Sequence, residues 1–459
     1  MMTFLQSFIT HRTRLGVVVL FSMLTVLGAG CGSSTLTAPA PIEIEIWRTA
    51  DTEDIFTDSM AEYNATYAHV SFKYRTFKED EYIDALFSAW SKGEGPDIFS
   101  VPNWRMGEFK EFISPLPKEV VLKRAYVEKK FGKKDILVEE RVNKLPTPAQ
   151  VKDRFVDVVA GDVVFNDEVY GLPLQMDTLG LFYNRDLMAR AQVAVPPTTW
   201  EEFRNAVQAM VVLDDESRVI QPAAAIGTAG NVAHYFDLLS VLMIQNGATM
   251  VTDRGSVSFA SGGDNNRLPG IEALDFYTKF SDPTFRTYTW DDTQLESLEA
   301  FTQGTLGFYF GYYEDLATIE KRAPNLNFSY TKLPQVDVNN PANYANYMVE
   351  SVHIGSDVTE HAWNFINFLT REEQAQAYME KTSKIPALRT KIGENQEDPI
   401  IGLFAQQALT AHSWYHGNDA EEAMDSFTEM ITETVAKSGT LEDIIGLAAR
   451  KIRLTIDQE

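Results

Sequence analysis

Aromatic rings and planar polar side chains stand side by side at two places where strands are predicted to end. Trp47 and Arg48 end one such strand, with Asp51 just after it, and Tyr312 and Tyr313 follow another. Rings stack on the C–H faces of a sugar, while carboxylate and guanidinium groups pair with its hydroxyls. Because ligands bind beyond the carboxyl ends of strands in open α/β sheets, these residues predict a site for a neutral, hydroxyl-bearing ligand. Adjacent side chains of an extended chain point to opposite faces, so only one of the two tyrosines is expected to face it.

Four further residues are candidates for the same site, and each also has an ordinary structural explanation. Asp97 opens a short apolar strand after the turn Gly93–Pro96, and Trp104 follows the end of that strand. Trp414 and Tyr415 lie in a polar segment that also holds two histidines. Core packing of the rings and capping of the turn by the aspartate would produce the same pattern.

The sequence lacks the common catalytic motifs. There is no H-E-x-x-H, G-x-S-x-G, P-loop or G-x-G-x-x-G pattern. His412 and His416 share a helical spacing but lie in an expected loop, and the single cysteine excludes an internal disulfide or a Cys-based zinc site. We therefore expect no catalytic residues, no metal and no cofactor. The 65 acidic residues leave one alternative open, a secreted glycoside hydrolase that uses a pair of carboxylates.

The elements that must position these residues begin as alternating strands and helices. Ile42–Ile46 and Val70–Tyr74 alternate apolar and polar residues, Asp97–Val101 is a short apolar strand, and segments with helical spacing separate them. This order predicts an α/β fold with a parallel sheet and right-handed crossovers.

A second unit begins near Tyr170. Leu179–Tyr183 and Leu306–Phe310 predict strands, and capping-box spacing after Pro197 predicts a helix that starts within 196–203. Further helices are expected over 271–280, 294–301 and 362–369 and from Ala420 onward.

Residues 118–155 differ in composition from the rest of the chain. They hold eleven Lys or Arg residues, whereas the whole chain carries a formal charge of −25. We interpret this segment as a solvated helical excursion; the alternative is a docking surface for a partner or for lipid headgroups. The acidic chain as a whole disfavours nucleic acid and an anionic lipid surface as main partners.

The N-terminus has the features of a secretory signal. Arg12 and Arg14 precede an unbroken apolar run, Leu15–Ala29, which is shorter than a membrane span. The run ends just before Cys31 and resembles a bacterial lipobox. We therefore expect residues 1–30 to be a lipoprotein signal peptide, Cys31 to carry the lipid, and residues 31–41 to form a flexible tether.

Seven short sequence motifs occur along the rest of the chain in a fixed order, and this order is what carries a family resemblance. The motifs are Gly95–Phe99, Tyr170–Pro173, Leu181–Leu187, Pro197–Phe203, Phe301–Phe308, Ala362–Leu369 and Lys384–Arg389. In this order they resemble the extracellular solute-binding proteins of bacterial ABC importers, in the branch that includes the maltodextrin-binding protein. The resemblance covers almost the whole chain after residue 41. Residues 118–155 are longer than the family pattern and resemble an insertion.

The resemblance implies a two-lobe α/β fold, the type II periplasmic-binding-protein fold, hinged by crossing segments. Lobe I would comprise residues 42–176 and 349–400, and lobe II residues 177–348 and 401–459. The crossing segments would add Gln175, Asp177 and Glu350 to the cleft between the lobes, and Arg389 would lie near its mouth.

The resemblance also implies a function. The chain would be the lipid-anchored substrate-binding component of an ABC importer, which captures a sugar or oligosaccharide by closure of its lobes and delivers it unchanged to the permease subunits. We expect a monomer on the extracytoplasmic face of a bacterial cell membrane, with no nucleic-acid partner. Because carboxylates and rings also suit ammonium groups, a polyamine or another small cation is an alternative ligand.

Overall fold

The computed structural model describes residues 39–456 except 50, 131–132, 253–254 and 263–266. The chain divides into two units, 1–37 and 38–459, and the described residues all belong to the second. The predicted signal peptide and Cys31 therefore lie outside the described residues. Within 39–456, no described helix is both long and apolar enough to cross a membrane.

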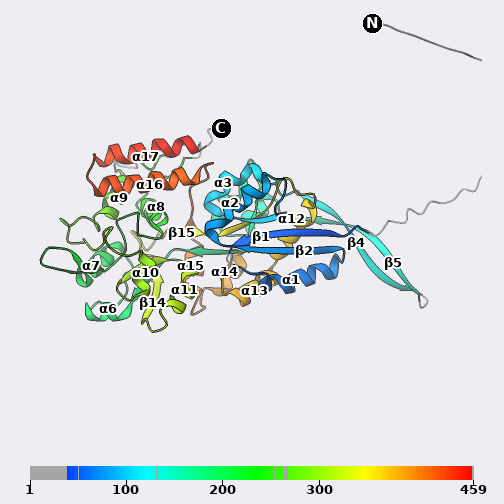
Figure 1. The fold of residues 1–459 in the computed structure, drawn as a ribbon, viewed down its shortest axis with the longest axis horizontal. Helices are drawn as coiled ribbons and strands as arrows, with labels where there is room; N and C mark the ends of the chain where they lie inside the picture. The colour runs from blue at the N-terminus through cyan, green and yellow to red at the C-terminus, as the bar shows by residue number, and fades with distance from the viewer. Residues whose placement is uncertain (1–38, 50, 131–132, 253–254, 263–266, 457–459) are drawn as a thin grey trace, which may run out of the picture. The chain divides into compact units, whose positions relative to one another are not determined.

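A five-stranded sheet organises the first half of the fold (Figure 1). Its order is β2 (Val70–Phe77), β1 (Ile42–Thr49), β3 (Ile98–Pro102), β16 (Met348–Val352) and β8 (Leu172–Pro173). β1 runs parallel to both β2 and β3, which confirms the predicted parallel arrangement, whereas β16 is antiparallel to β3. Apolar residues alternate along β1, so that Ile44 and Ile46 are buried in the core beneath the sheet.

Helices connect and cover these strands. α1 (Glu53–Thr66) and α2 (Glu79–Trp90) connect the parallel strands, and α1 buries Phe56, Met60 and Tyr63. The other elements packed with this sheet or next to it along the chain are η1 (Asn103–Arg105), α3 (Met106–Phe109), η2 (Lys110–Phe112), α4 (Pro148–Arg154), α5 (Asp157–Val163), β6 (Val164–Phe165), β7 (Glu168–Val169), α12 (Thr359–Leu369), α13 (Glu372–Thr382) and α14 (Arg389–Asn395).

The basic segment forms a β-hairpin, so the predicted helical excursion over 118–155 is wrong for most of its length. β4 (Glu119–Lys130) pairs antiparallel with β5 (Lys133–Lys144), and only α4 at the end of the segment is helical. The segment is rich in β-branched residues, which favour strands, but its many lysines obscure this signal. These residues are Val120, Val121 and Val127 in β4 and Ile136, Val138 and Val142 in β5. We call residues 119–144 the β-ribbon.

The second half of the fold is built on two smaller sheets. The three-stranded sheet has the order β13 (Phe308–Gly311), β10 (Gly180–Asn184) and β14 (Phe328–Lys332). The four-stranded sheet has the order β17 (Ile385–Pro386), β9 (Gln175–Thr178), β15 (Asn343–Asn346) and β18 (Ala411–His412). β11 (Val212–Leu213) and β12 (Val219–Gln221) form a separate pair.

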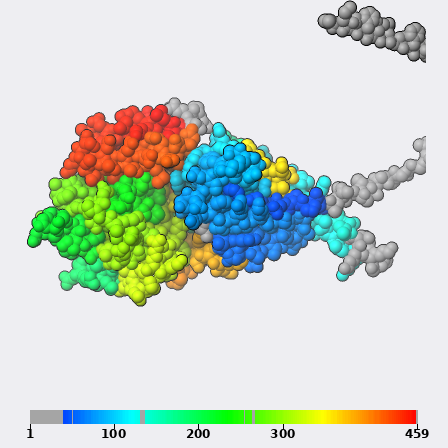
Figure 2. All heavy atoms as spheres, viewed as in Figure 1, coloured from blue at the N-terminus to red at the C-terminus, as the bar shows by residue number. Residues whose placement is uncertain are grey.

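The helices of this half are α6 (Arg185–Arg190), α7 (Trp200–Met210), α8 (Tyr235–Gln245), α9 (Pro269–Thr278), α10 (Ser297–Thr302), α11 (Asp315–Arg322), α15 (Gly402–Ala408), α16 (Ala420–Val435) and α17 (Leu441–Thr455). The predicted helix start is confirmed, because Thr199 caps α7 and forms a capping box with Glu202. Figure 2 shows α16 and α17, in orange and red, covering the green elements, and their apolar residues pack into the second core with α8 and α9.

The chain passes from one sheet to another close to the predicted crossings. β8 ends at Pro173 in the five-stranded sheet, and β9 begins at Gln175 in the four-stranded sheet. β15 ends at Asn346, and β16 begins at Met348 back in the first sheet. The lobe boundaries at residues 176, 348 and 400 stay predictions, but the side chains near these crossings are placed beside the site described next.

Candidate ligand-binding site

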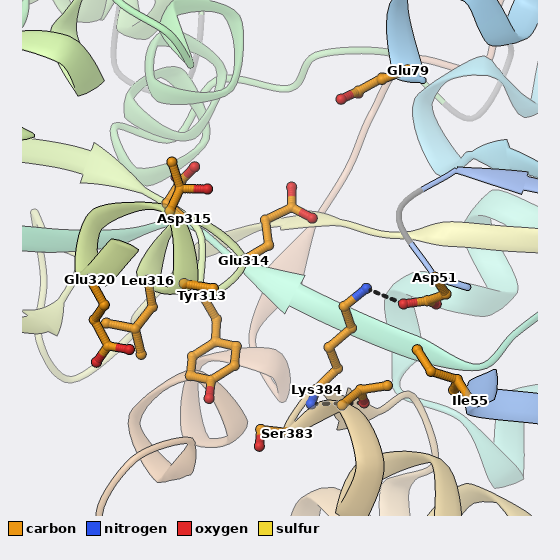
Figure 3. A pocket seen from close by; sticks show the side chains of 13 residues that line it. Asp51, Ile55, Glu79, Tyr313, Glu314, Asp315, Leu316, Glu320, Ser383 and Lys384 are labelled. Atoms are coloured by element: carbon orange, nitrogen blue, oxygen red, sulfur yellow. Dashed lines mark hydrogen bonds and ion pairs between the residues drawn. The ribbon is translucent and has the colours of Figure 1, made fainter. Parts of the chain in front are cut away.

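A cavity of about 600 Å³ lies between the end of β1 and the start of α11. One wall holds Asp51 and Ile55 together with Glu79, the first residue of α2. The opposite wall is Tyr313–Thr318 with Glu320, and Thr382–Lys384 lie between the two. Figure 3 shows Lys384 reaching towards Asp51, with Glu314 projecting into the space from the other side.

A neighbouring cavity of about 370 Å³ shares Asp51, Glu79, Glu314 and Lys384 with the first. It extends along the carboxyl ends of β1 and β2, where ligands bind in open α/β sheets. Its other lining residues are Arg48, Thr49, Thr76, Phe77, Lys78, Gln175 and Met348. We call the two joined cavities the cleft.

Beneath the cleft, charged side chains form a network that is largely buried. Arg48 lies 3.0 Å from Asp51 and 3.2 Å from Glu350, and Lys384 Nζ lies 2.8 Å from Asp51 Oδ1. Burial alone would raise the pKa of Asp51, but the two cations hold it below its usual range. Burial raises the pKa of Glu350, although Arg48 opposes this change. The network thus fixes an ionised carboxylate, Asp51, at the cleft wall.

The opposite wall carries the carboxyl groups of Glu314 and Asp315, and Asp177 lies beside it. Asp177 accepts hydrogen bonds from the backbone N–H groups of Thr178 (2.7 Å) and Glu314 (3.1 Å). Burial and the nearby charge of Glu314 raise the pKa of Asp177 well above its usual range. Glu314 itself is exposed to the cleft, yet the protein atoms around it and the charge of Asp315 raise its pKa as well.

Behind this wall, His234 lies 3.4 Å from Asp315, whose carboxylate also accepts a hydrogen bond from Tyr309 (2.9 Å). Burial alone would lower the pKa of His234, but the hydrogen bond and charge of Asp315, with the charge of Asp237, raise it to about 9. The imidazolium therefore balances Asp315 at neutral pH, whereas Glu314, Glu320 and Glu79 form no ion pair within the described lining.

The structure brings together six of the residues predicted from the sequence. Arg48, Asp51, Gln175 and Tyr313 line the cleft. Asp177 lines a small adjoining space, and Glu350 lies beneath, joined to the cleft wall through Arg48. As expected for adjacent residues, only one tyrosine of the pair Tyr312 and Tyr313 faces the site.

Four predicted aromatic residues instead pack in the cores. Trp47 is 5% exposed, contacts Phe77 at 4.6 Å between ring centroids and donates from Nε1 to Glu45. The remaining three use their polar atoms inside the second core: Tyr312 donates to Asp237, Trp414 to Ser240, and Tyr415 to Thr455. These rings are turned away from the cleft because hydrophobic burial and a hydrogen-bond partner are both available inside the fold.

Three other predicted residues lie away from the cleft. Asp97 precedes β3 at its amino end and accepts hydrogen bonds from Glu45 and Ser356. Trp104 is half-buried beside Arg105, and Arg389 on α14 pairs with Asp157 at 2.9 Å. Asp97 therefore joins the start of β3 to β1 and to the segment before α12 instead of capping the turn, and Arg389 has a carboxylate partner of its own.

Several residues of the cleft escaped prediction. Phe77, Lys78 and Glu79 directly follow or end β2, and Glu314 follows the predicted tyrosines. Ser383 and Lys384 directly precede β17. Extending the strand-end rule to every predicted strand would have found most of them, whereas the pairing of Lys384 with Asp51, 333 residues away, has no local signal.

The described residues contain no cluster of His, Cys, Asp or Glu that could hold a metal ion. His416 is paired with the buried carboxylate of Asp162 at 2.8 Å. His416 therefore has a structural partner, and the two histidines noted in the sequence belong to no such cluster within the described part.

Comparisons with known proteins identify relatives of this chain. The sequence profile of the bacterial extracellular solute-binding proteins matches residues 58–399. A putative binding protein of Brucella abortus is 22% identical over 271 residues, and the alignment covers 56% of this chain and 59% of the Brucella protein. The galactooligosaccharide-binding protein of Bacillus subtilis is 23% identical over 407 residues, which are 86% of this chain and 85% of that protein.

Solved structures share the fold. The cyclic α-maltosyl-1,6-maltose binding protein from Arthrobacter globiformis superposes with a TM-score of 0.70 at 16% identity, over 91% of this chain and 99% of that one. A cyclo/maltodextrin-binding protein complexed with maltotetraose superposes with a TM-score of 0.67 at 17% identity, over 91% of this chain and 98% of that one. The predicted two-lobe α/β fold is thereby confirmed.

The family works outside the cytoplasm, and its members are binding proteins. Its profile spans the crossings between the sheets and the cleft residues from Thr76 to Lys384, whereas β1, Arg48 and Asp51 precede it. This chain belongs to the family of bacterial extracellular solute-binding proteins.

Proposed function

We propose that this chain is the substrate-binding component of an ABC importer that captures a sugar or an oligosaccharide in the cleft. Closure of the two lobes on the ligand would be driven by its contacts with both walls, since a ligand shifts a conformational equilibrium only by its differential affinity. The permease subunits would receive the ligand unchanged, so no catalytic step is involved. Lipid on Cys31 would hold the monomer at the extracytoplasmic face of the membrane.

The observation that supports this proposal most strongly is the pairing of walls across the cleft. Asp51 and Gln175 offer planar polar groups on one side, Tyr313 offers a ring on the other, and Lys384 donates between them. A neutral sugar offers C–H faces that stack on a ring and hydroxyl groups that pair with planar polar groups, and the cleft provides both partners. Two of the similar proteins carry oligosaccharides in their names, which favours the same ligand class here.

A small cation is the second candidate, because the cleft holds more carboxylates than cations. Glu79, Glu314 and Glu320 form no ion pair within the described lining, where Arg48 and Lys384 pair with Asp51 and Lys78 pairs with Glu81 outside it. An ammonium group would find both charge and a ring in this wall.

Isothermal titration calorimetry separates these candidates. Maltotetraose, a galactooligosaccharide and spermidine are titrated separately into the protein, and the sugars are analysed afterwards by chromatography. We expect stoichiometric binding of a sugar and no change in its chain length. Binding of spermidine alone would favour the cation, and shortened sugar would favour the glycoside hydrolase.

A variant pair locates the binding. Tyr313→Ala should weaken sugar affinity about tenfold, since a stacked ring contributes about 1.4 kcal/mol. Tyr126→Ala, which removes an exposed tyrosine of the β-ribbon, is the matched control and should leave the affinity unchanged. Equal affinities of both variants would contradict the placement of the ligand in the cleft.

A further inference from the structure

The β-ribbon carries an exposed apolar face that nothing in the described structure covers. Its base is buried, with Val120 and Leu122 in the first core, but the residues beyond leave the body of the fold. Figures 1 and 2 show the cyan ribbon extending past the blue elements of the five-stranded sheet. A two-stranded ribbon alone is marginally stable in water, so a second surface would stabilise it.

The register of the two strands places most of the exposed β-branched residues on one face. Directly opposed residues share a face, so the pairs Val121–Val142, Ala125–Val138 and Val127–Ile136 lie on one face together with the pair Lys123–Glu140. The opposite face carries Val120, Leu122, Tyr126 and Leu137 among charged residues. The β-branched side chains of the first face are well exposed: Val121 44%, Val127 56%, Ile136 69% and Val142 56%.

Lysines lie along this same face. Lys123, Lys129 and Lys144 are exposed there. Glu140 is directly opposite Lys123 and Glu119 directly opposite Lys144, whereas Lys129 is opposite Lys134, so lysines outnumber carboxylates on this face. Counted over residues 119–144, the sequence has eight Lys or Arg and five Asp or Glu, a local charge of +3 (8 − 5) in a chain of −25. Apolar β-branched residues between lysines suit the boundary between lipid headgroups and acyl chains, where the lysines meet phosphates.

The ribbon leaves the sheet at the end opposite the cleft. Asn143 at its base donates a hydrogen bond to Tyr67 (3.0 Å), just before β2, and the Ile42 N–H donates to His69 (2.9 Å). Cleft residues follow the other ends of these strands, about 26 Å away for an eight-residue strand. The ribbon is therefore too far from the cleft to serve as its lid.

The same end of the sheet is where the N-terminal chain enters. Ile42 is eleven residues from Cys31, a stretch that spans at most about 40 Å when extended. The twelve residues of β4 span about 40 Å as well. A body tethered through residue 31 could thus bring the ribbon to the surface that holds its anchor.

We propose that the β-ribbon docks on an anionic lipid bilayer through the face that carries Val121, Val127, Ile136 and Val142. Lys123, Lys129 and Lys144 pair with lipid phosphates, and the apolar side chains enter the interface. The ribbon then acts as a second, non-covalent contact that orients the tethered body with its cleft directed away from the bilayer. This role is independent of which ligand the cleft binds.

Vesicle co-sedimentation of residues 39–459, the compact unit without Cys31, tests the proposal. Vesicles of equal phosphatidylglycerol and phosphatidylcholine are compared with pure phosphatidylcholine at 50 mM and 500 mM salt. We expect binding to the anionic vesicles at low salt that weakens at high salt and is at least about tenfold stronger than binding to neutral vesicles.

Two matched double variants assign this binding to the ribbon. Lys123→Glu with Lys129→Glu should reduce binding at least about tenfold. Lys321→Glu with Lys332→Glu makes the same change in net charge on exposed residues outside the ribbon and should retain binding. Val127→Thr with Ile136→Thr keeps β-branched side chains but should weaken binding several-fold.

Circular dichroism and the calorimetric affinity for sugar should be unchanged in all three variants, which separates this test from the test of the cleft. Equal binding to neutral vesicles, or equal losses in both lysine variants, would overturn the proposal. If analytical ultracentrifugation shows dimers that depend on the ribbon and vesicles are not bound, the proposal is overturned. The face would then be a contact with a second copy of the chain.

Discussion

Replacing Arg48 with Met should destabilise the protein more than any exposed charge substitution. The Arg48 side chain is 4% exposed and lies between two carboxylates that are themselves 5% and 2% exposed, Asp51 and Glu350. Methionine retains most of the volume and leaves both carboxylates without this cation. Removing one partner of a buried ion pair costs about 3–5 kcal/mol.

The two carboxylates should not contribute equally to this cost. Asp51 keeps Lys384 at 2.8 Å and the hydroxyl of Tyr378 at 2.7 Å. Glu350 keeps only the Ser100 hydroxyl (2.9 Å) among its described hydrogen-bond donors. Adding Glu350→Gln to Arg48→Met should therefore restore about 1–3 kcal/mol, because it removes the buried charge that has lost its counterion.

Urea denaturation followed by far-ultraviolet circular dichroism measures both effects. Arg218→Met is the matched control, since Arg218 is 74% exposed in its pairs with Asp214 and Glu216, and its loss should cost less than about 1 kcal/mol. A cost for Arg48→Met as small as that of the control would refute the reasoning. So would a double variant less stable than Arg48→Met alone.

Three further predictions follow from the site, the core and the N-terminus. The pKa of His234 is raised from 6.5 to about 9, which corresponds to roughly 3 kcal/mol of stability. This stability is fully present below pH 6.5 and is lost as the pH rises through 9. The difference in unfolding free energy between wild type and His234→Gln should therefore be larger at pH 6 than at pH 10, and an unchanged difference would contradict the ion pair with Asp315. Trp414→Ala should cost about 3–5 kcal/mol in urea denaturation, because the buried ring packs against Phe236 and Phe427, and a variant as stable as wild type would exclude this packing. Cys31→Ala should release the protein from the membrane fraction after a high-salt wash, which also disrupts ribbon contacts, and persistent association would argue against lipidation.

Local sequence signals predicted the local structure well. The capping box at Thr199 and the alternation along β1 depend on residues within a few positions of one another, so they appear in the structure as expected. The β-ribbon was misread as helix because its β-branched residues are split between a buried base and an exposed end, and its lysines mask them. The lysine content of the segment favoured a solvated helix, whereas the paired register of β4 and β5 shows a hairpin.

The sequence predicted where the candidate site lies, but only some of the residues that line it. Strand ends located Arg48, Asp51 and Tyr313, because topology brings those ends together. Residue type alone does not tell which face of an element a ring occupies, so Trp47 and Trp414 were assigned to the cleft although both pack in the cores. The pairing of Lys384 with Asp51 could not be predicted from local patterns, because it joins segments hundreds of residues apart.

The central claim is that two lobes close on a sugar in the cleft. Residues 39–459 contain no cysteine, so spin labels on Glu81→Cys and Lys321→Cys report one distance between α2 and α11 by double electron–electron resonance. Addition of an oligosaccharide that binds in calorimetry should shorten this distance and narrow its distribution. An unchanged distance at saturating sugar would contradict capture by lobe closure.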